Sequence, residues 1–552
     1  MKKLPIGIEN FKELIDNNYY FVDKTLFIKD VFNEKLALYT RPRRFGKTLN
    51  MSMLYYFFSN KEKENSYLFD GLDISKDKEI MKYQNKYPVI LISLKDMKNK
   101  TFDNQLSMFS YLISMFLKNN TELLNSDILN ESDKSTLIKY ENGTATEIEL
   151  QNALNYLTYC LEKHYQSKVI ILIDEYDVPL QSAYENGYYE DMVDFLRSVF
   201  SSSLKTNSSL EKGILTGCLR ISKESIFTGL NNFKSFSILD IKSSQRFGFT
   251  HEEVKNLLDY YGLGQYIQEV KEWYDGYLFG DTEIYTPWST LMYVDRKLQK
   301  DSLQPISFWS NTSGNDIVVN YIKQSDQTLH DEFELLMQGK TLKKKINPEL
   351  TYRDMDNIHN IYSFLLMTGY LKVHKEIVPN EVYELIIPNK EVYKIYEKSF
   401  MDYFSEIQFQ YKNQLIALLN DEKVEKAQSM LNDILEKSIS YYDNYESFYH
   451  GFLLGLFQGL EVSSNKESGN GRFDIEILPR RLDETVLIIE CKHSKTLDDL
   501  IDDSKKASKQ IIDKRYLSNI KYKKYNKVIG YGISFFKKQC FITKANDSNN
   551  VV

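Results

Sequence analysis

Residues 36–48 read Leu36-Ala37-Leu38-Tyr39-Thr40-Arg41-Pro42-Arg43-Arg44-Phe45-Gly46-Lys47-Thr48, and this stretch decides the fold of the first half of the chain. The apolar run at its start predicts a buried strand, and the apolar residues after Thr48 predict a helix. A turn ending in Gly-Lys-Thr between such a strand and such a helix is the context that a phosphate-binding loop needs. Its backbone N–H groups face the phosphates, Lys47 neutralises their charge, and the Thr48 hydroxyl reaches Mg²⁺.

A second stretch supplies the acids that such a loop works with. Residues 169–173, Val-Ile-Ile-Leu-Ile, predict another buried strand, and Asp174 and Glu175 follow it directly. Asp174 suits the coordination sphere of the metal, and Glu175 is the candidate base for the attacking water. Together the two stretches indicate an ATPase that binds ATP and Mg²⁺.

The loop departs from the usual pattern at one position. Phosphate-binding loops place a glycine six residues before the lysine, and this chain has Arg41 there. A side chain restricts the backbone where glycine allows a positive φ angle. Either Arg41, Arg43 and Arg44 contact the phosphates, or they are ordinary surface charges. The alternative to a phosphate site is a turn that merely caps a helix, and it leaves Asp174 and Glu175 unexplained.

Short apolar runs separated by helical stretches continue to about residue 250. They lie at Leu36–Thr40, Val89–Leu94, Val169–Ile173, Gly213–Gly217 and Phe236–Ile241, with a predicted helix from Glu147 to Tyr165. This alternation predicts a parallel sheet covered on both faces by helices, with the nucleotide at the carboxyl ends of the strands. The run that lies between the two motifs, and the acid beside Asp174, indicate the subgroup of P-loop ATPases with an added central strand.

Three polar residues near these strands are further candidates. Thr216 ends a predicted strand, where it either positions the water or senses the γ-phosphate. Arg220 follows one helical turn later and is either a γ-phosphate contact or a surface arginine. As a contact it acts within its own chain or on a neighbouring copy, so a homo-oligomer is one expectation. Asp177 is either an indirect metal ligand or the N-cap of the helix after Pro179, and its position favours the cap.

The middle of the chain is predicted to be helical. Thr250 and Glu253 form the Thr-x-x-Glu pattern of a capping box, which starts a helix. From there to about Phe400, helical patterns alternate with aromatic turns such as Trp273 to Tyr277. Aromatic side chains of this kind either stack on bases or pack a core, and the pattern favours core packing.

The last 150 residues carry a second set of polar side chains. A predicted helix from Tyr445 has Glu446 at its start, a predicted strand from Arg472 to Ile477 carries Asp474, and a buried strand from Val486 ends in Glu490-Cys491-Lys492. Phosphodiester hydrolysis needs carboxylates to hold Mg²⁺, a metal-activated water and a nearby cation. Asp474, Glu490 and Lys492 supply this set. Glu446 is either a further metal ligand or a carboxylate favoured by the helix dipole alone.

These motifs resemble the AAA-ATPase-like family, prokaryotic proteins that often carry a C-terminal PD-(D/E)XK nuclease domain. The resemblance covers nearly the whole chain, and it is carried by Leu4–Ile8, Phe21–Thr25, Arg41–Thr48, Asp174–Pro179, Thr216–Gly217, Phe227–Asn232, Trp273–Tyr277, the turn Ser463–Arg472 and the pair Gln510 and Tyr516. It implies that Arg41 is a family trait. It further implies an α/β fold with an AAA-like P-loop domain, a helical lid and an α/β/α nuclease-like domain, and we hypothesise an ATP-driven nuclease that acts on foreign DNA.

Length and composition agree with a multidomain enzyme. A chain of 552 residues is too long for one core, and we expect an ATPase-like domain at 1–250, a lid at 251–400 and a nuclease-like domain at 401–552. The sequence has no apolar run of the ~18 residues that span a bilayer and no apolar segment behind its first lysines. We therefore expect a cytoplasmic protein without a membrane partner. Four scattered cysteines predict neither structural zinc nor disulfides.

The charge distribution points to nucleic acid at one end of the chain. The net charge of −7 predicts neither a nucleic-acid nor a membrane partner, but Ser504 to Lys544 contains twelve lysines and arginines and one acid, Asp513. A basic region beside a metal site is typical of a protein that binds a phosphate backbone, and we expect DNA as the partner.

Two functions remain open from the sequence. One is an ATP-driven machine that loads or gates a metal-dependent nuclease. The other is a nucleotide-dependent switch whose C-terminal domain, a degraded nuclease fold, binds nucleic acid or protein without cutting. Close approach of Asp474, Glu490 and Lys492 favours the first, and their separation favours the second.

Overall fold

The structure is a computed structural model. It describes residues 1–220, 233–309, 327–357 and 360–438, and from the C-terminal part 449, 452–453, 456–457, 461–464, 467–468, 471–472, 474–479, 481, 483–514, 516–518 and 525–545. The chain divides into two compact units, Met1–Ser313 with Leu335–Ile395, and Gly314–Glu334 with Tyr396–Val552. The division into three domains expected from the sequence stays a prediction.

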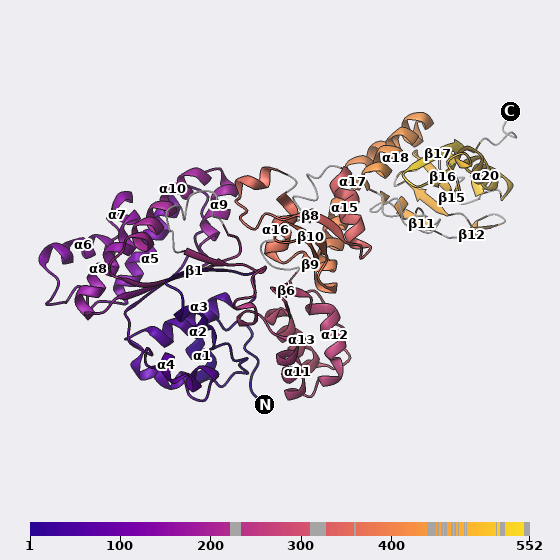
Figure 1. Ribbon diagram of the computed structural model, residues 1–552. Coiled ribbons are helices and arrows are strands. Elements are labelled where there is room, and N and C mark those ends of the chain that lie inside the picture. The colour runs from indigo at the N-terminus through magenta and orange to yellow at the C-terminus, as the bar shows by residue number, and fades with distance from the viewer. Residues whose placement is uncertain are drawn as a thin grey trace. The chain divides into compact units, whose positions relative to one another are not determined.

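The first unit is built around a five-stranded parallel sheet in the order β2-β3-β4-β1-β5. Its strands are β1 (Leu36–Thr40), β2 (Val89–Ser93), β3 (Val169–Asp174), β4 (Leu210–Gly217) and β5 (Phe233–Phe236). The residues of β1 and β3 are all buried, as expected for strands covered on both faces. Figure 1 shows helices α1–α4 on one side of this sheet and α9 and α10 on the other. The predicted α/β fold class is confirmed.

Strand β4 lies between β1 and β3, so the prediction of an added central strand is confirmed. The apolar run at 89–94 forms the edge strand β2 instead. The last predicted strand was placed too far along the chain, because β5 ends at Phe236. The backbone N–H and the hydroxyl of Ser237 both donate to Asp240 and form a turn there.

Helices fill the connections of this sheet. They are α1 (Phe11–Asp16), α2 (Phe27–Phe32), α3 (Lys47–Phe58), α4 (Lys78–Met81), α5 (Phe102–Lys118), α6 (Glu131–Glu141), α7 (Glu147–Gln151), α8 (Ala153–Tyr165), α9 (Val178–Asn186) and α10 (Tyr189–Phe200). The helix predicted from Glu147 to Tyr165 is wrong as a single helix, since it breaks at Asn152 into α7 and α8. Thr146 and Glu149 form a capping box that gives α7 its own start.

The rest of the first unit mixes helices with small antiparallel sheets. Its elements are α11 (His251–Tyr260), α12 (Ile267–Tyr274), β6 (Tyr277–Phe279), β7 (Thr282–Ile284), α13 (Pro287–Gln299), β8 (Leu342–Lys345), α16 (Ile361–Thr368), β9 (Lys372–Val378) and β10 (Val382–Ile386). The capping box of Thr250 and Glu253 at the start of α11 is confirmed. The sheet β8-β10-β9 corrects the expectation of a helical region. Its strand β9 is largely exposed and polar, so it leaves no apolar pattern in the sequence.

Two helices cross the boundary between the units, α15 (Gln327–Met337) and α17 (Lys390–Asn420). The second unit contains a mixed five-stranded sheet, β11-β14-β15-β16-β17, and a two-stranded ribbon, β12-β13. Its elements are α18 (Val424–Ser438), β11 (Glu461–Ser464), β12 (Glu467–Ser468), β13 (Gly471–Arg472), β14 (Ile475–Leu478), β15 (Thr485–His493), α20 (Leu500–Asp513), β16 (Lys527–Phe536) and β17 (Gln539–Lys544). The strand predicted from 472 to 477 is therefore split, with Arg472 in the ribbon and Ile475 in the larger sheet.

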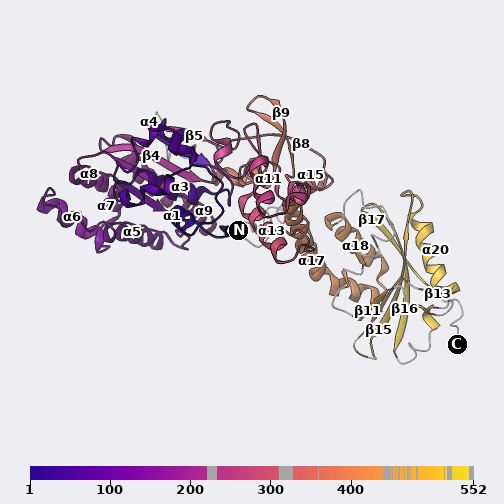
Figure 2. The same ribbon diagram turned by 90° about the horizontal axis from the view of Figure 1, so that it is seen from below.

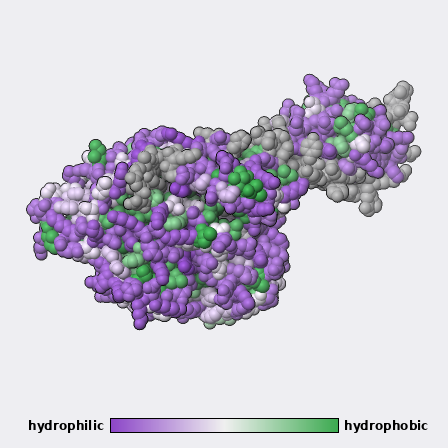
Figure 3. Space-filling model, viewed as in Figure 1, coloured by the Kyte–Doolittle hydropathy of each residue, from purple (hydrophilic) through white to green (hydrophobic). Residues whose placement is uncertain are grey.

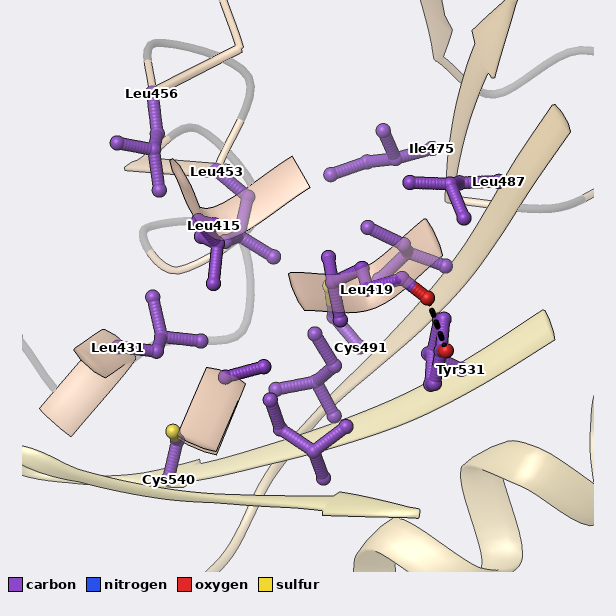
Figure 4. Packing of buried hydrophobic residues seen from close by; sticks show 14 of the residues in the cluster. Leu415, Leu419, Leu431, Leu453, Leu456, Ile475, Leu487, Cys491, Tyr531 and Cys540 are labelled. Carbon is purple, nitrogen blue, oxygen red and sulfur yellow. Dashed lines mark hydrogen bonds between the residues drawn. The ribbon is translucent and has the colours of Figure 1, made fainter. Parts of the chain in front are cut away.

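The sheet of the second unit separates two cores (Figure 2). One face packs with leucines of α17 and α18 in a large apolar cluster that includes Leu487, Ile489 and Cys491. Figure 4 shows this cluster, in which the hydroxyl of Tyr531 donates to the carbonyl of Leu419. The other face, with Val486 and Ile488, packs under α20. Glu490 follows Ile488 by two residues, so it lies on the α20 face.

The surface in Figure 3 is mostly hydrophilic, with hydrophobic residues in scattered patches. Within the part of the chain that the structure describes, none of the helices combines the length and apolarity needed to cross a lipid bilayer.

Candidate functional site

The carboxyl ends of three neighbouring strands bring the first set of predicted residues together. Thr48 is the second residue of α3, Asp174 ends β3, and Thr216 lies near the end of β4. The Thr48 hydroxyl donates to Asp174 Oδ2 at 2.7 Å, and the Thr216 hydroxyl donates to Asp174 Oδ1. Asp174 is 1% exposed. One buried carboxylate is thus fixed by a hydroxyl from the loop and a hydroxyl from the central strand.

Lys47 is folded into its own loop. Its Nζ donates to the carbonyls of Arg41 at 3.1 Å and Pro42 at 3.0 Å, and it lies 3.7 Å from Sγ of Cys218. Burial would lower the pKa of Lys47, but the acidic groups around it, Cys218 foremost and then Glu175, outweigh burial and raise the pKa above its ordinary value. The side chain therefore stays a cation at the centre of the site.

The backbone of the loop explains why arginine is accepted in place of glycine. The positive φ angles of the loop occur at Arg44 (71°) and Gly46 (80°), whereas Arg41 has no positive φ. Position 41 does not need the conformational freedom of glycine. The departure from the usual pattern leaves the shape of the loop intact.

The side chain of Arg41 anchors the loop from behind. It is completely buried, and its guanidinium donates to the carbonyls of Thr40, Phe236 and Ser243. The guanidinium carbon lies 5.1 Å and 5.2 Å from the ring centres of Phe247 and Phe279. Burial lowers the pKa of Arg41 to about 10. The interpretation of this side chain as a phosphate ligand is therefore wrong, and only its backbone carbonyl contacts Lys47.

Arg43 and Arg44 leave the loop in different directions. Arg43 donates to Oε1 of Gln181 on α9 at 2.8 Å. The guanidinium of Arg44 lies 4.5 Å from the ring centre of Trp288 on α13. Both arginines line a cavity beside the loop. They are therefore not simple surface charges, and they are not packed behind the loop as Arg41 is.

This loop cavity has a volume of about 480 Å³. Its polar wall includes Gly46, Lys47, Thr48 and Glu175, and its apolar wall includes Ile8, Val22, Phe249, Trp288 and Leu291. Ile8 and Val22 come from the N-terminal segment, Trp288 and Leu291 from α13, and Phe249 from the residues just before α11. A polar end that presents a phosphate loop and an apolar end that accepts a flat ring suit a nucleotide.

Glu175 is held in an unusual backbone conformation. Its φ angle is 52°, which is uncommon for a residue with a side chain, and it lines the loop cavity. Burial raises the pKa of Glu175, Lys47 lowers it, and the charges of Asp174 and Asp177 raise it further, with a net increase. Strained residues and displaced carboxyl pKa values gather at functional sites. Glu175 therefore stays the candidate base.

Asp177 is the N-cap residue of α9, as predicted, although its side chain makes no capping bond. Its Oδ2 accepts the backbone N–H groups of Cys218 at 2.8 Å and Leu219 at 3.0 Å. These bonds fix the turn after β4, and the capping bond is lost because the carboxylate points at that turn.

Arg220 lies away from the loop cavity. It pairs with Oε1 of Glu349 at 3.0 Å and does not line the cavity. A contact between Arg220 and a γ-phosphate would require this pair to open, and its role stays a proposal.

The C-terminal candidates meet at the junction of β14 and β15. Ile475 pairs with Ile489, which brings Asp474, the preceding residue, level with Glu490. Asp474 Oδ2 accepts the backbone N–H of Cys491 at 2.8 Å. Lys492 lies two residues beyond Glu490, on the same face of the strand. The structure thus brings Asp474, Glu490 and Lys492 to one end of the α20 face.

Glu490 is 4% exposed, and its Oε1 accepts the side-chain N–H of Gln510 on α20. Glu446, the remaining predicted ligand, lies outside the described residues. Among residues that are described, no group of three or more histidine, cysteine or carboxylate side chains is close enough to hold a metal. The oxygen donors of Asp474 and Glu490 suit Mg²⁺, and the metal site stays a prediction.

The basic stretch is partly neutralised within the unit. Lys527 and Lys544 both pair with Glu422, and Lys506 pairs with Asp503. Lys505, Lys509 and Lys514 are exposed on α20 or at its end.

Sequence reasoning missed the apolar wall of the loop cavity. The core packing predicted for the aromatic turns holds for Trp309, which is 2% exposed and stacked on Tyr370, whereas Trp288 lines the loop cavity. Trp288 differs from the other aromatic residues of these turns only in its position beside Pro287, in the first turn of α13.

Comparison with known proteins agrees with the two kinds of domain expected from the sequence. Residues 5–227 match the family model described as predicted AAA-ATPase, and residues 444–545 match the PD-(D/E)XK nuclease superfamily, which confirms the resemblance. A protein described as uncharacterised, in the vnfD 5′ region of Azotobacter chroococcum mcd 1, is 24% identical over 504 residues, which cover 86% of this chain and 87% of that protein. The chain thus carries an AAA-ATPase-like domain and a PD-(D/E)XK nuclease superfamily domain.

Proposed function

We propose that the protein binds and hydrolyses ATP and that its C-terminal domain is a Mg²⁺-dependent nuclease that acts on DNA. The observation that carries the first half is the buried carboxylate of Asp174, bound by both Thr48 and Thr216 beside Lys47. The second half rests on Asp474, Glu490 and Lys492 at one end of the α20 face.

The loop residues have distinct roles in ATP binding. Lys47 already contacts two loop carbonyls, and β- and γ-phosphate oxygens would replace these weaker acceptors. Thr48 and Asp174 present oxygens 2.7 Å apart, and these two residues would hold Mg²⁺, which prefers oxygen donors. The cation supplies charge neutralisation for the transferred phosphate when it is bound.

Glu175 is the proposed general base. A buried carboxylate with a raised pKa takes a proton more readily than an exposed one. Thr216, held at 0% exposure beside Asp174, would fix the hydrogen-bonding pattern around the attacking water. Arg43, in the same cavity wall, adds positive charge where negative charge develops.

The C-terminal residues divide the work of phosphodiester cleavage. Asp474 and Glu490 would hold Mg²⁺, whose chemistry is to activate water and polarise the phosphate. The backbone bond to Cys491 fixes Asp474, and the bond from Gln510 fixes Glu490. Lys492 would offset charge on the phosphate. We place these activities in the cytoplasm, and the choice of foreign DNA as target rests on the family resemblance.

The proposal is tested by incubating the purified protein with plasmid, linear and single-stranded DNA and with RNA, each with and without Mg²⁺ and ATP. We expect Mg²⁺-dependent DNA cleavage that Glu490→Ala abolishes while ATP hydrolysis continues, and loss of ATP hydrolysis in Lys47→Ala. If the wild type binds ATP but cuts no nucleic acid in any condition, the nucleotide-dependent switch replaces the nuclease.

A further inference from the structure

The positive φ angle of Glu175 is imposed by hydrogen bonds on both sides of the residue. In the preceding peptide, the carbonyl of Asp174 accepts the backbone N–H of Leu94, just after β2, at 2.9 Å. In the following peptide, the N–H of Tyr176 donates to the carbonyl of Thr216 in β4 at 3.1 Å. Because both flanking peptide groups are bound to neighbouring segments, a change of φ from 52° toward the usual negative range would strain one of these bonds.

The side chains of the next two residues bind the turn after β4. Tyr176 is completely buried, and its hydroxyl donates to the carbonyl of Leu219 at 2.6 Å. Asp177 accepts the backbone N–H groups of Cys218 and Leu219, as described above. Tyr176 and Asp177 together therefore bind both the donor and the acceptor of the Leu219 backbone.

Gly217 allows the two segments to approach this closely. A Cβ atom at this position would lie 2.6 Å from Cε1 of Tyr176 and 2.7 Å from Oδ1 of Asp177. Gly217 has no positive φ angle, so glycine is required here for space rather than for backbone conformation. Any side chain at position 217 would push the turn after β4 away from Tyr176 and Asp177.

Backbone strain at a residue with a side chain persists only where the surrounding structure imposes it. We propose that Tyr176 and Asp177 are positioning residues for Glu175. By binding the turn after β4, they hold the strained backbone that places the Glu175 side chain in the wall of the loop cavity. Glu175 lines this cavity, whereas Tyr176 and Asp177 do not, so they act through Glu175 and not on the nucleotide. This inference rests on the proposed role of Glu175 as the general base.

A role limited to the fold would have a different effect. Sγ of Cys218, in the turn after β4, lies 3.7 Å from Nζ of Lys47. A turn that is displaced as a whole would therefore disturb the phosphate end of the cavity and lower the affinity for ATP. A role through Glu175 lowers turnover and leaves the affinity for ATP unchanged.

Tyr176→Phe is compared with Tyr140→Phe in the full chain. Each substitution removes the hydroxyl of a buried tyrosine that donates to a backbone carbonyl. The hydroxyl of Tyr140 donates to the carbonyl of Glu149 at 2.8 Å, joining α6 to α7, and Tyr140 does not line the loop cavity. Tyr140→Phe is thus a matched control for the loss of one such bond.

A second pair of variants separates the hydrogen bonds of Asp177 from its size. Asp177→Ala removes both acceptor oxygens, whereas Asp177→Asn keeps one oxygen that can accept the two backbone N–H groups. ATP affinity is measured by calorimetry, turnover by phosphate release, and stability by thermal unfolding. Each substitution is studied alone and together with Glu175→Gln.

We expect Tyr176→Phe and Asp177→Ala to lower turnover at least about tenfold, since misplacing a catalytic group by about 1 Å costs up to about a hundredfold. Their ATP affinity should stay within about twofold of wild type. Asp177→Asn should recover most of the turnover that Asp177→Ala loses, and Tyr140→Phe should keep wild-type turnover. Together with Glu175→Gln, neither substitution should lower turnover further, because both act through the same carboxylate.

Wild-type turnover in Tyr176→Phe and Asp177→Ala would overturn the inference. A parallel loss of ATP affinity would also overturn it, as would losses of turnover that multiply with the loss in Glu175→Gln. A wild type that binds ATP without hydrolysing it would instead overturn the proposed function.

Discussion

The hydroxyl of Thr48 donates a 2.7 Å hydrogen bond to Oδ2 of Asp174, joining the first residues of α3 to the end of β3. These residues are 126 positions apart in the chain. The bond holds the two oxygens that the proposed Mg²⁺ would use, so it orders the metal site before any ligand arrives.

We predict that Thr48→Val lowers ATP turnover at saturating Mg²⁺ by at least about tenfold, because valine keeps the shape and removes the oxygen. Thr48→Ser retains the hydroxyl and should stay close to wild type. Steady-state phosphate release measures both. Equal rates for the valine and serine variants would show that the hydroxyl has no part in the reaction.

Arg41→Met is predicted to destabilise the first unit more than it weakens ATP binding. The change leaves the carbonyls of Thr40 and Phe236 without their donor inside the fold. The expected loss is about 3 kcal/mol. Thermal unfolding measures it, with Arg481→Met, which removes an exposed arginine, as the control.

At a temperature where Arg41→Met is folded, its ATP affinity should exceed that of Lys47→Ala. If an Arg41 variant unfolds like wild type but binds ATP as poorly as Lys47→Ala, the side chain of Arg41 is a phosphate ligand after all.

Glu391 makes stability depend on pH. Burial raises its pKa from 4.5 to about 7, against the opposing effects of Ser289, Trp309, Phe308 and Arg44. The folded state therefore binds a proton that the unfolded state releases near pH 4.5. The stabilisation is complete below pH 4.5 and is lost as the pH rises through 7, a change of about 3 kcal/mol.

Glu391→Gln mimics the protonated form and should remove this dependence. Chemical unfolding at pH 5 and at pH 8 measures the difference between wild type and variant. If wild type and Glu391→Gln lose the same stability between pH 5 and pH 8, Glu391 is not the source of the pH dependence.

Lys492→Ala should abolish DNA cleavage and keep metal binding. The lysine follows Glu490 on the same face, where it can offset phosphate charge, but an ammonium cannot ligate Mg²⁺. Calorimetric titration with Mn²⁺ and a plasmid nicking assay give the two readouts, and Lys426→Ala, at an exposed lysine of α18 outside the basic stretch, is the control. Loss of metal binding in Lys492→Ala would mean that the lysine only supports the fold.

The sequence predicted the elements whose signals are local. The apolar run and the Gly46-Lys47-Thr48 turn predict β1 and α3 from neighbouring residues alone. The apolar run before Asp174 and Glu175 predicts β3 in the same way. The register that brings Asp474 level with Glu490 was not predicted, because β15 is a continuous apolar run whose sequence does not show how it pairs with β14.

The contacts that the sequence did not predict join residues far apart in the chain. Arg41 is held by Phe236, Phe247 and Phe279, about 200 residues away, and nothing near Arg41 shows that an aromatic pocket will form around it. Trp288 reaches the loop cavity only because α13 packs there. Polar strands such as β9 leave no periodic pattern, so the sheet β8-β10-β9 was also missed.

The central claim, ATP hydrolysis at the loop cavity, is tested most directly by Glu175→Gln. ATP affinity and steady-state turnover are measured for this variant, wild type and Glu185→Gln, which changes an exposed glutamate of α9. The glutamine can hold the attacking water but cannot take its proton. We expect wild-type affinity with turnover reduced at least about a hundredfold in Glu175→Gln, and wild-type values in Glu185→Gln. Wild-type turnover in Glu175→Gln would contradict the account.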